Sequence, residues 1–239
     1  MWLFSRNDTI RDSGLLEGFT DWHCHLLPGV DDGVKEVAET LQILAVWEEL
    51  GVKQVWLTPH IMEDIANEPA ALSQRFEALK RDYKGSISLH LAAENMMDDL
   101  FNSRLDNANL LPLGSSATHL LVETSYFNPP FGMSSILDKV KQQGFFPVLA
   151  HPERYQYMDA DDYKKYKQQG VLFQLNVPSL AGVYGKEVQK KAEMLLDKGY
   201  YDLCGTDTHN LRFVNTFINS KLSAKVIKAV KQLMEKEVI

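Results

Sequence analysis

The chain has 239 residues, of which 45% are hydrophobic and 24% charged, so it can bury a full core and need not contain more than one domain. Its formal net charge of −7 argues against a nucleic-acid groove or an anionic membrane surface, because either would need a basic excess. Two cysteines cannot form a disulfide framework and no stretch approaches the ~20 apolar residues of a membrane span, so we expect a cytoplasmic protein without membrane insertion.

Short β-branched or aromatic runs alternate with helical patterns, which predicts seven strand–helix units. In chain order, strands are expected at residues 19–24, 52–60, 87–95, 119–125, 145–153, 171–179 and 200–209, and helices at 34–51, 69–83, 133–144, 159–170, 186–199 and 216–236. This alternation favours a parallel sheet, either closed into a barrel or doubly wound. No Pro/Ser/Gly linker interrupts it, so we predict a lead-in over residues 1–18 and one domain over residues 19–239.

The first expected helix carries apolar side chains at i, i+3, i+4 and i+7, and this face is predicted to pack against the sheet. Its members are Val34, Val37, Ala38, Leu41, Leu44 and Ala45.

Six of the seven expected strands end in residue types that bind metals. These residues are His23 and His25, His60, Glu94, Glu123, His151, and Asp207 with His209. Because the functional end of an α/β sheet or barrel is the C-terminal end of its strands, these side chains are expected to meet at one rim.

Side chains alternate between the two faces of a strand, so His23 and His25 share a face while Cys24 points the other way. The same parity turns Cys204 away from Asp207. The cysteines are therefore predicted to be wall residues.

His90 and His119 each lie four residues before a strand-end glutamate, ~13 Å down the strand, and are interpreted as structural. Taken singly, the strand-end residues have ordinary alternatives. Asp31 and Asp32 could cap a helix, and His60 could be a turn histidine.

Jointly, the motifs HCHLLPGVDDG, TPH, AAEN, VETS, HPER and GTDTHN resemble the polymerase-and-histidinol-phosphatase (PHP) superfamily of metal-dependent phosphoesterases. The likeness is strongest to bacterial tyrosine phosphatases of capsule and exopolysaccharide synthesis, and it runs from Phe19 to Asn210. This resemblance implies a distorted (β/α)7 TIM-like barrel of the PHP type with three metal ions.

The resemblance also implies which residues bind each ion. The first would take His23, His25, Glu94 and Asp207, the second Glu94, Glu123 and His151, and the third Asp32, His60 and His209. Asp32 is preferred to Asp31 because it lies nine residues after His23, as in the family motif. Imidazole and carboxylate ligands without thiolate suit manganese, our first choice, and also iron or zinc.

The implied reaction is in-line attack on phosphorus by a hydroxide that bridges the first two metals, with His151 among the ligands and Arg154 of HPER clamping the phosphate. In the resembled family this arginine is also a proposed proton donor. The alternative for Arg154 is a surface ion pair with Glu153.

The implied substrate is the phosphotyrosine tail of a bacterial tyrosine kinase of polysaccharide export. Aromatic residues after the ligand-bearing strands could flank its ring, although ordinary loop packing would explain them equally well; they are Tyr126, Phe127, Phe131, Tyr155, Tyr157 and Phe213. Whether Arg212 contacts substrate stays open.

A thiol-based phosphatase is excluded, because Cys-x5-Arg would need arginine where Val30 and Asn210 stand. Two alternatives remain. One is a PHP phosphatase for a small phosphate such as histidinol phosphate, and the other is a metal-stabilised scaffold that binds a kinase.

Overall fold

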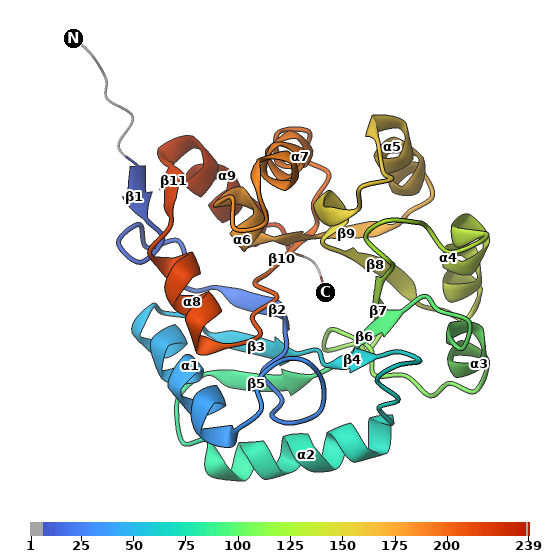
Figure 1. Ribbon diagram of the computed structural model, residues 1–239, viewed down its shortest axis with the longest axis horizontal. Coiled ribbons are helices and arrows are strands. Elements are labelled where there is room, and N and C mark those ends of the chain that lie inside the picture. The colour runs from blue at the N-terminus through green and yellow to red at the C-terminus, as the bar shows by residue number, and fades with distance from the viewer. Residues whose placement is uncertain (1–6, 238) are drawn as a thin grey trace.

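A barrel of parallel strands surrounded by helices forms the centre of the molecule (Figure 1). The computed structural model describes residues 7–237 and 239. The barrel strands are β2 (Thr20–Cys24), β3 (Gln54–Leu57), β4 (His60–Ile61), β5 (Ser88–Leu91), β6 (Glu94–Met96), β7 (His119–Glu123), β8 (Phe146–Ala150), β9 (Leu172–Asn176) and β10 (Leu203–Gly205). The helices are α1 (Val37–Glu49), α2 (Pro69–Asp82), α3 (Phe101–Asp106), α4 (Met133–Gln142), η1 (Pro152–Arg154), α5 (Ala160–Gln168), α6 (Val177–Leu180), α7 (Lys186–Asp197), α8 (Leu211–Ile218) and α9 (Ala224–Met234).

Two sheets make up the barrel wall, one with the order β2-β3-β5 and the other with the order β10-β9-β8-β7-β6-β4. β4 continues the course of β3 after an interruption at Pro59, which has no N–H for a ladder bond. β6 continues the course of β5 after an interruption at Ala92 and Ala93. Backbone hydrogen bonds from Asp207 N to His23 O (2.7 Å) and from His25 N to Thr208 O (2.9 Å) join β2 to the segment after β10. They close the strands into a distorted barrel, which confirms the predicted fold class.

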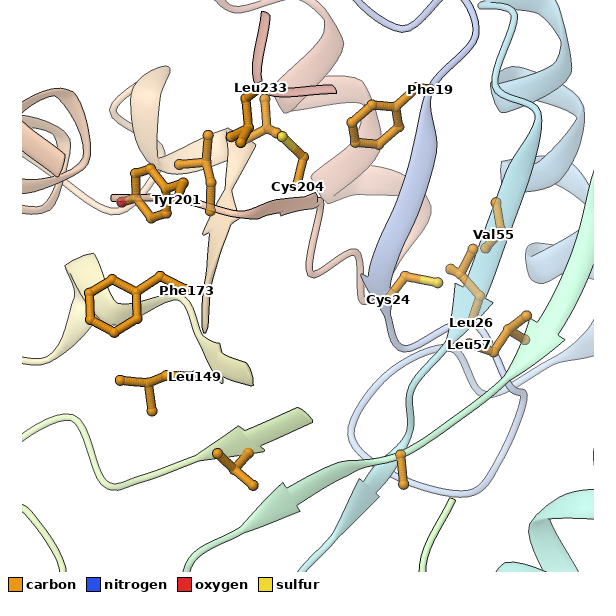
Figure 2. Close-up of a cluster of buried hydrophobic side chains, with 14 of the residues drawn as sticks. Phe19, Cys24, Leu26, Val55, Leu57, Leu149, Phe173, Tyr201, Cys204 and Leu233 are labelled. Carbon is orange, nitrogen blue, oxygen red and sulfur yellow. The ribbon is translucent and has the colours of Figure 1, made fainter. Parts of the chain in front are cut away.

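The apolar core lies between the barrel wall and the helices, and both cysteines belong to it. Figure 2 shows Cys24 beside Val55 and Leu57, and Cys204 near Leu233. Both thiols are free and buried, as the strand alternation predicted.

The face of α1 that packs inward differs from the predicted one. The helix begins at Val37, which is 36% exposed, and it buries Thr40, Ile43, Leu44 and Trp47. Because Trp47 offers more apolar area than the alanines of the predicted face, its burial decides the rotation of the helix.

The expected helix over residues 216–236 is also wrong. α8 ends at Ile218, and β11 (Lys221–Ser223) pairs antiparallel with β1 (Asn7–Thr9) before α9 begins. The Ser223 side chain then accepts a hydrogen bond from Val226 N and caps α9, so a strand and a new helix start replace the continuous helix.

The described part of the lead-in packs onto the rest of the chain. Besides the pairing of β1 with β11, Ile10, Leu15 and Leu16 are buried in the core cluster. Among the described residues, no helix is both long and apolar enough to span a membrane.

Candidate metal centre

The nine predicted ligands converge at the C-terminal rim of the barrel. Four overlapping groups have ligand atoms within 4.8 Å of one another: His25, Asp32, His60 and His209; His23, His25 and Asp207; His23, Glu94 and His151; and His60, Glu94 and Glu123. They meet because neighbouring parallel strands present their carboxyl ends to the same rim.

Glu94, at the start of β6, lies in the middle of this cluster. Its Oε2 is 3.1 Å from His23 Nε2, 3.3 Å from His25 Nε2 and 3.1 Å from His60 Nδ1. Its Oε1 is 3.0 Å from His151 Nε2. Burial raises the pKa of Glu94, but His23 and His60 outweigh burial and hold it well below its usual range. Glu94 is therefore an anion that can be shared between two ions.

The expected second ligand set is less tightly grouped than the first. His25 Nε2 and Asp207 Oδ1 of the first set are 3.3 Å apart. In the second set, His151 Nε2 lies 3.9 Å from Glu123 Oε2, whereas Glu123 Oε1 is 2.9 Å from His60 Nδ1. His60 thus lies between the expected second and third sets.

Asp31 and Asp32 have different surroundings. Asp32 Oδ1 lies 3.5 Å from both His60 Nε2 and His209 Nε2, and its side chain is 63% exposed at the mouth of the site. Asp31 is buried, and its Oδ2 is 2.8 Å from His25 Nδ1. Neither aspartate caps α1, whose N-cap residue is Glu36. Asp31 instead orients the His25 ring, an outer-sphere role that the sequence motif did not reveal.

Backbone strain concentrates at this rim. His151 has φ 33° and Asp207 has φ 52°, both in the left-handed region. A Cβ at Gly205 would lie 2.6 Å from His23 Cβ, so only glycine lets these two segments approach. Strained residues of this kind persist where the surrounding structure fixes them, as at functional sites.

Sequence reasoning missed the contribution of β9, the strand without a metal-ligand residue type. The buried Gln174 Oε1 accepts a hydrogen bond from His23 Nδ1 at 2.9 Å. The buried Asn176 Nδ2 donates to Asp207 Oδ2 at 3.3 Å. The sequence signal for these supporting residues is an amide side chain at alternate positions near the end of a strand whose neighbours carry metal ligands.

Arg154 belongs to the site and does not form the alternative ion pair with Glu153. Its Nη1 donates to Asp207 Oδ2 at 2.5 Å, and its side chain is only 15% exposed. Glu153 is fully buried, where it accepts hydrogen bonds from Tyr201 Oη and Asn176 N.

The electrostatics of the site call for cations. Burial lowers the pKa of His23, but Glu94 and Asp207 outweigh burial and raise it to about 9. His60 Nδ1, Glu94 Oε2 and Glu123 Oε1 are buried without a hydrogen-bond partner among the described residues. His60 Nδ1 lies 3.1 Å from Glu94 Oε2 and 2.9 Å from Glu123 Oε1 without hydrogen-bond geometry, so these three atoms are suited to binding cations.

The donor set fits divalent metal ions. It consists of imidazole nitrogens and carboxylate oxygens, which suit manganese, iron or zinc, and it contains no thiolate. The described histidines outside the four groups are His90, which stacks on Trp56, and His119, which stacks on Phe146. Both contacts agree with the structural role predicted for these two histidines.

The predicted aromatic residues do not form one surface. Tyr155 is fully buried. Phe127, by contrast, is 65% exposed and Phe131 is fully exposed, both on the loop after β7. Tyr157 Oη lies 2.6 Å from Thr124 Oγ1, and Phe213 packs against Tyr184. Arg212 is exposed on the first turn of α8.

Comparison with known proteins supplies independent information. A family model described as "Capsular polysaccharide synthesis, CpsB/CapC" matches residues 19–237. The tyrosine-protein phosphatase YwqE of Bacillus subtilis is 28% identical over 201 residues, which cover 82% of this chain and 79% of the relative. The tyrosine-protein phosphatase CpsB of Streptococcus pneumoniae is 26% identical over 207 residues, covering 80% and 83%.

The fold has a solved counterpart. A similar fold is found among the crystal structures of YwqE from Bacillus subtilis and CpsB from Streptococcus pneumoniae, which are called unique metal-dependent tyrosine phosphatases. The TM-score is 0.75 at 24% identity, and the match covers 92% of this chain and 87% of the other.

Proposed function

Because this chain belongs to the CpsB/CapC family of capsular polysaccharide synthesis, we propose that it is a metal-dependent protein-tyrosine phosphatase. The observation that carries the proposal is the cluster of buried histidines and carboxylates around Glu94, with the guanidinium of Arg154 beside it. A cationic donor next to a metal cluster is suited to binding and hydrolysing a phosphate ester.

We assign three ions to the cluster. His23, His25, Glu94 and Asp207 would hold the first, Glu94, Glu123 and His151 the second, and Asp32, His60 and His209 the third. Bound divalent ions would polarise the phosphoryl oxygens and lower the pKa of water enough for it to act as the nucleophile. With four carboxylates against three such ions, the site would carry about +2 charge, which favours a dianionic phosphate.

Arg154 would hold the phosphate by hydrogen bonds and keep its own proton. Burial lowers its pKa, but Asp207 together with Tyr126, Tyr184 and Glu153 outweighs burial and raises the pKa above its usual value. Arg154 is therefore a poor acid. A tyrosyl leaving group has a pKa of ~10 and needs little protonation to depart, so an arginine that only clamps the phosphate suffices.

The partner that we propose is the phosphotyrosine tail of a bacterial tyrosine kinase of polysaccharide export, met in the cytoplasm. The family description supports a role in capsule synthesis, and the relatives' names support phosphotyrosine as the substrate. The exposed Phe127 and Phe131 lie on the loop that follows Glu123, where the segment around a phosphotyrosine would pass.

The test is phosphate release from a tyrosine-phosphorylated peptide by the full chain, after chelation and after resupply of manganese. A His151→Ala variant should lose metal-dependent release, because it removes a nitrogen 3.0 Å from Glu94. His90→Ala is the matched control, since His90 packs on Trp56 outside the cluster.

The outcomes separate the proposal from its rivals. Equal release by both variants would remove His151 from the site. Release from histidinol phosphate but not from the peptide would point to a small-molecule phosphatase. No release with any divalent ion would leave the kinase-binding scaffold.

A further inference from the structure

The guanidinium of Arg154 lies between two tyrosine rings. Its Cζ is 4.4 Å from the centroid of Tyr126 and 4.3 Å from that of Tyr184. Tyr126 follows β7 and Tyr184 follows β9, the strands on either side of β8, after which Arg154 is found. The rings therefore approach Arg154 from the two neighbouring loops.

This arrangement restricts how the arginine can be used. All five N–H groups of a guanidinium lie in its plane, so rings over its faces leave only its edge for hydrogen bonds. One donor on that edge, Nη1, is bonded to Asp207 in the cluster. The remaining donors also lie in the guanidinium plane, around its rim, so a phosphate that approaches the cluster in that plane can accept from them.

Both rings are themselves held in place. Asn176 Nδ2 donates to Tyr184 Oη at 3.2 Å and also to Asp207 Oδ2 at 3.3 Å, so one amide ties Tyr184 to the residue that pairs with Arg154. Tyr126 packs 5.8 Å from His151 and 6.2 Å from Tyr155, measured between ring centroids. The positions of the rings are thus coupled to those of the candidate ligands.

We propose that Tyr126 and Tyr184 are positioning residues that hold Arg154 edge-on to the phosphate of the substrate. The inference rests on the proposed function. Without the rings, a long side chain with several rotatable bonds would sample other rotamers, and water would solvate its faces. A desolvated, pre-oriented donor stabilises charge in the transition state more than a mobile one does.

The test compares leucine and phenylalanine at each position in the manganese-loaded full chain. Tyr126→Leu and Tyr184→Leu remove the ring and should each lower kcat/KM for a phosphotyrosyl peptide about 5- to 30-fold, the range expected for a desolvated cation–π contact. Tyr126→Phe should recover most of this loss. Tyr184→Phe should recover less, because it loses the bond to Asn176.

The decisive readout is the combination with Arg154→Ala. If the rings act through the arginine, either leucine substitution should cause no further loss in that background. An equal loss with and without Arg154 would overturn the inference. Tyr200→Leu is the matched control, since Tyr200 is a half-buried tyrosine that faces the cation of Lys198 away from the cluster.

A second measurement is independent of turnover. The dissociation constant of inorganic phosphate, measured by calorimetry on manganese-loaded protein, should rise in both leucine variants, with bound manganese unchanged. An unchanged constant would refute the clamp even if activity fell. Wild-type protein that binds phosphate through the clamp but does not hydrolyse the peptide would instead count against the proposed function alone.

Discussion

Replacing Gln174 should weaken metal binding although this residue touches no ion in our assignment. Gln174 Oε1 can only accept, so in the neutral ring that binds metal its 2.9 Å bond fixes the hydrogen of His23 on Nδ1. The Nε2 lone pair then faces Glu94 and Asp207. Gln174→Met keeps a similar volume and removes that acceptor. The His23 ring then loses its fixed tautomer and orientation.

The size of the effect follows from the kind of contact removed. Loss of an outer-sphere partner typically costs 10–100-fold in metal affinity, or about 1.4–2.7 kcal/mol. The buried N–H of His23, left without an acceptor, should also lower the free energy of unfolding of the metal-free protein by about 1–3 kcal/mol. The two effects are measured separately.

Manganese affinity would be measured by competition with a chelator, and stability by urea unfolding of the metal-free protein. Gln174→Glu should keep the affinity within a few fold, because a carboxylate accepts the same bond. Gln169→Met is the control, since Gln169 donates to Ser134 O outside the site. Wild-type manganese affinity in Gln174→Met would refute the role assigned to this bond.

Two pH effects are also expected. Manganese binds the neutral His23 ring, whose pKa without metal is raised to about 9, so the affinity for manganese should increase from pH 6 to pH 9. Binding should release protons, which calorimetry in buffers of different ionisation enthalpy measures. An affinity that does not change with pH would contradict this. Burial raises the pKa of Glu237 to about 7, despite bonds from Trp22 Nε1 and Cys204 N. Because the folded pKa exceeds the unfolded value, this contribution to stability is present below about pH 4.5 and is lost as the pH rises through 7. Urea unfolding of Glu237→Gln should therefore show a smaller loss of stability between pH 4.5 and 7.5 than wild type, and an identical loss would rule out Glu237 as its source.

Errors in the predicted elements arose where tertiary contacts overrode local pattern. The apolar spacing of residues 34–51 matched a helix face, yet burial of Trp47 turned α1 to another face. The C-terminal pattern read as one helix, but pairing with β1 drew residues 221–223 into a strand. The buried residues Thr40, Ile43, Leu44 and Trp47 are also spaced i, i+3, i+4 and i+7, so the periodicity of this segment allows either face. The partner of residues 221–223 lies at the other end of the chain, so no local pattern could indicate that pairing.

The sequence alone determined which residue types stand at the strand ends. Side chains alternate along a strand and parallel strands end at one rim, so His23, His25, Glu94 and Asp207 could be expected to converge from local periodicity. The family resemblance already implied that Glu94 is shared between two ions. Only the tertiary structure decided that Glu94 also lies beside His60 and that Asp31 supports His25. It also decided that rings from two loops enclose Arg154. Those contacts depend on how the closing barrel tilts its strands and folds its loops together, a long-range geometry that no spacing within the chain encodes.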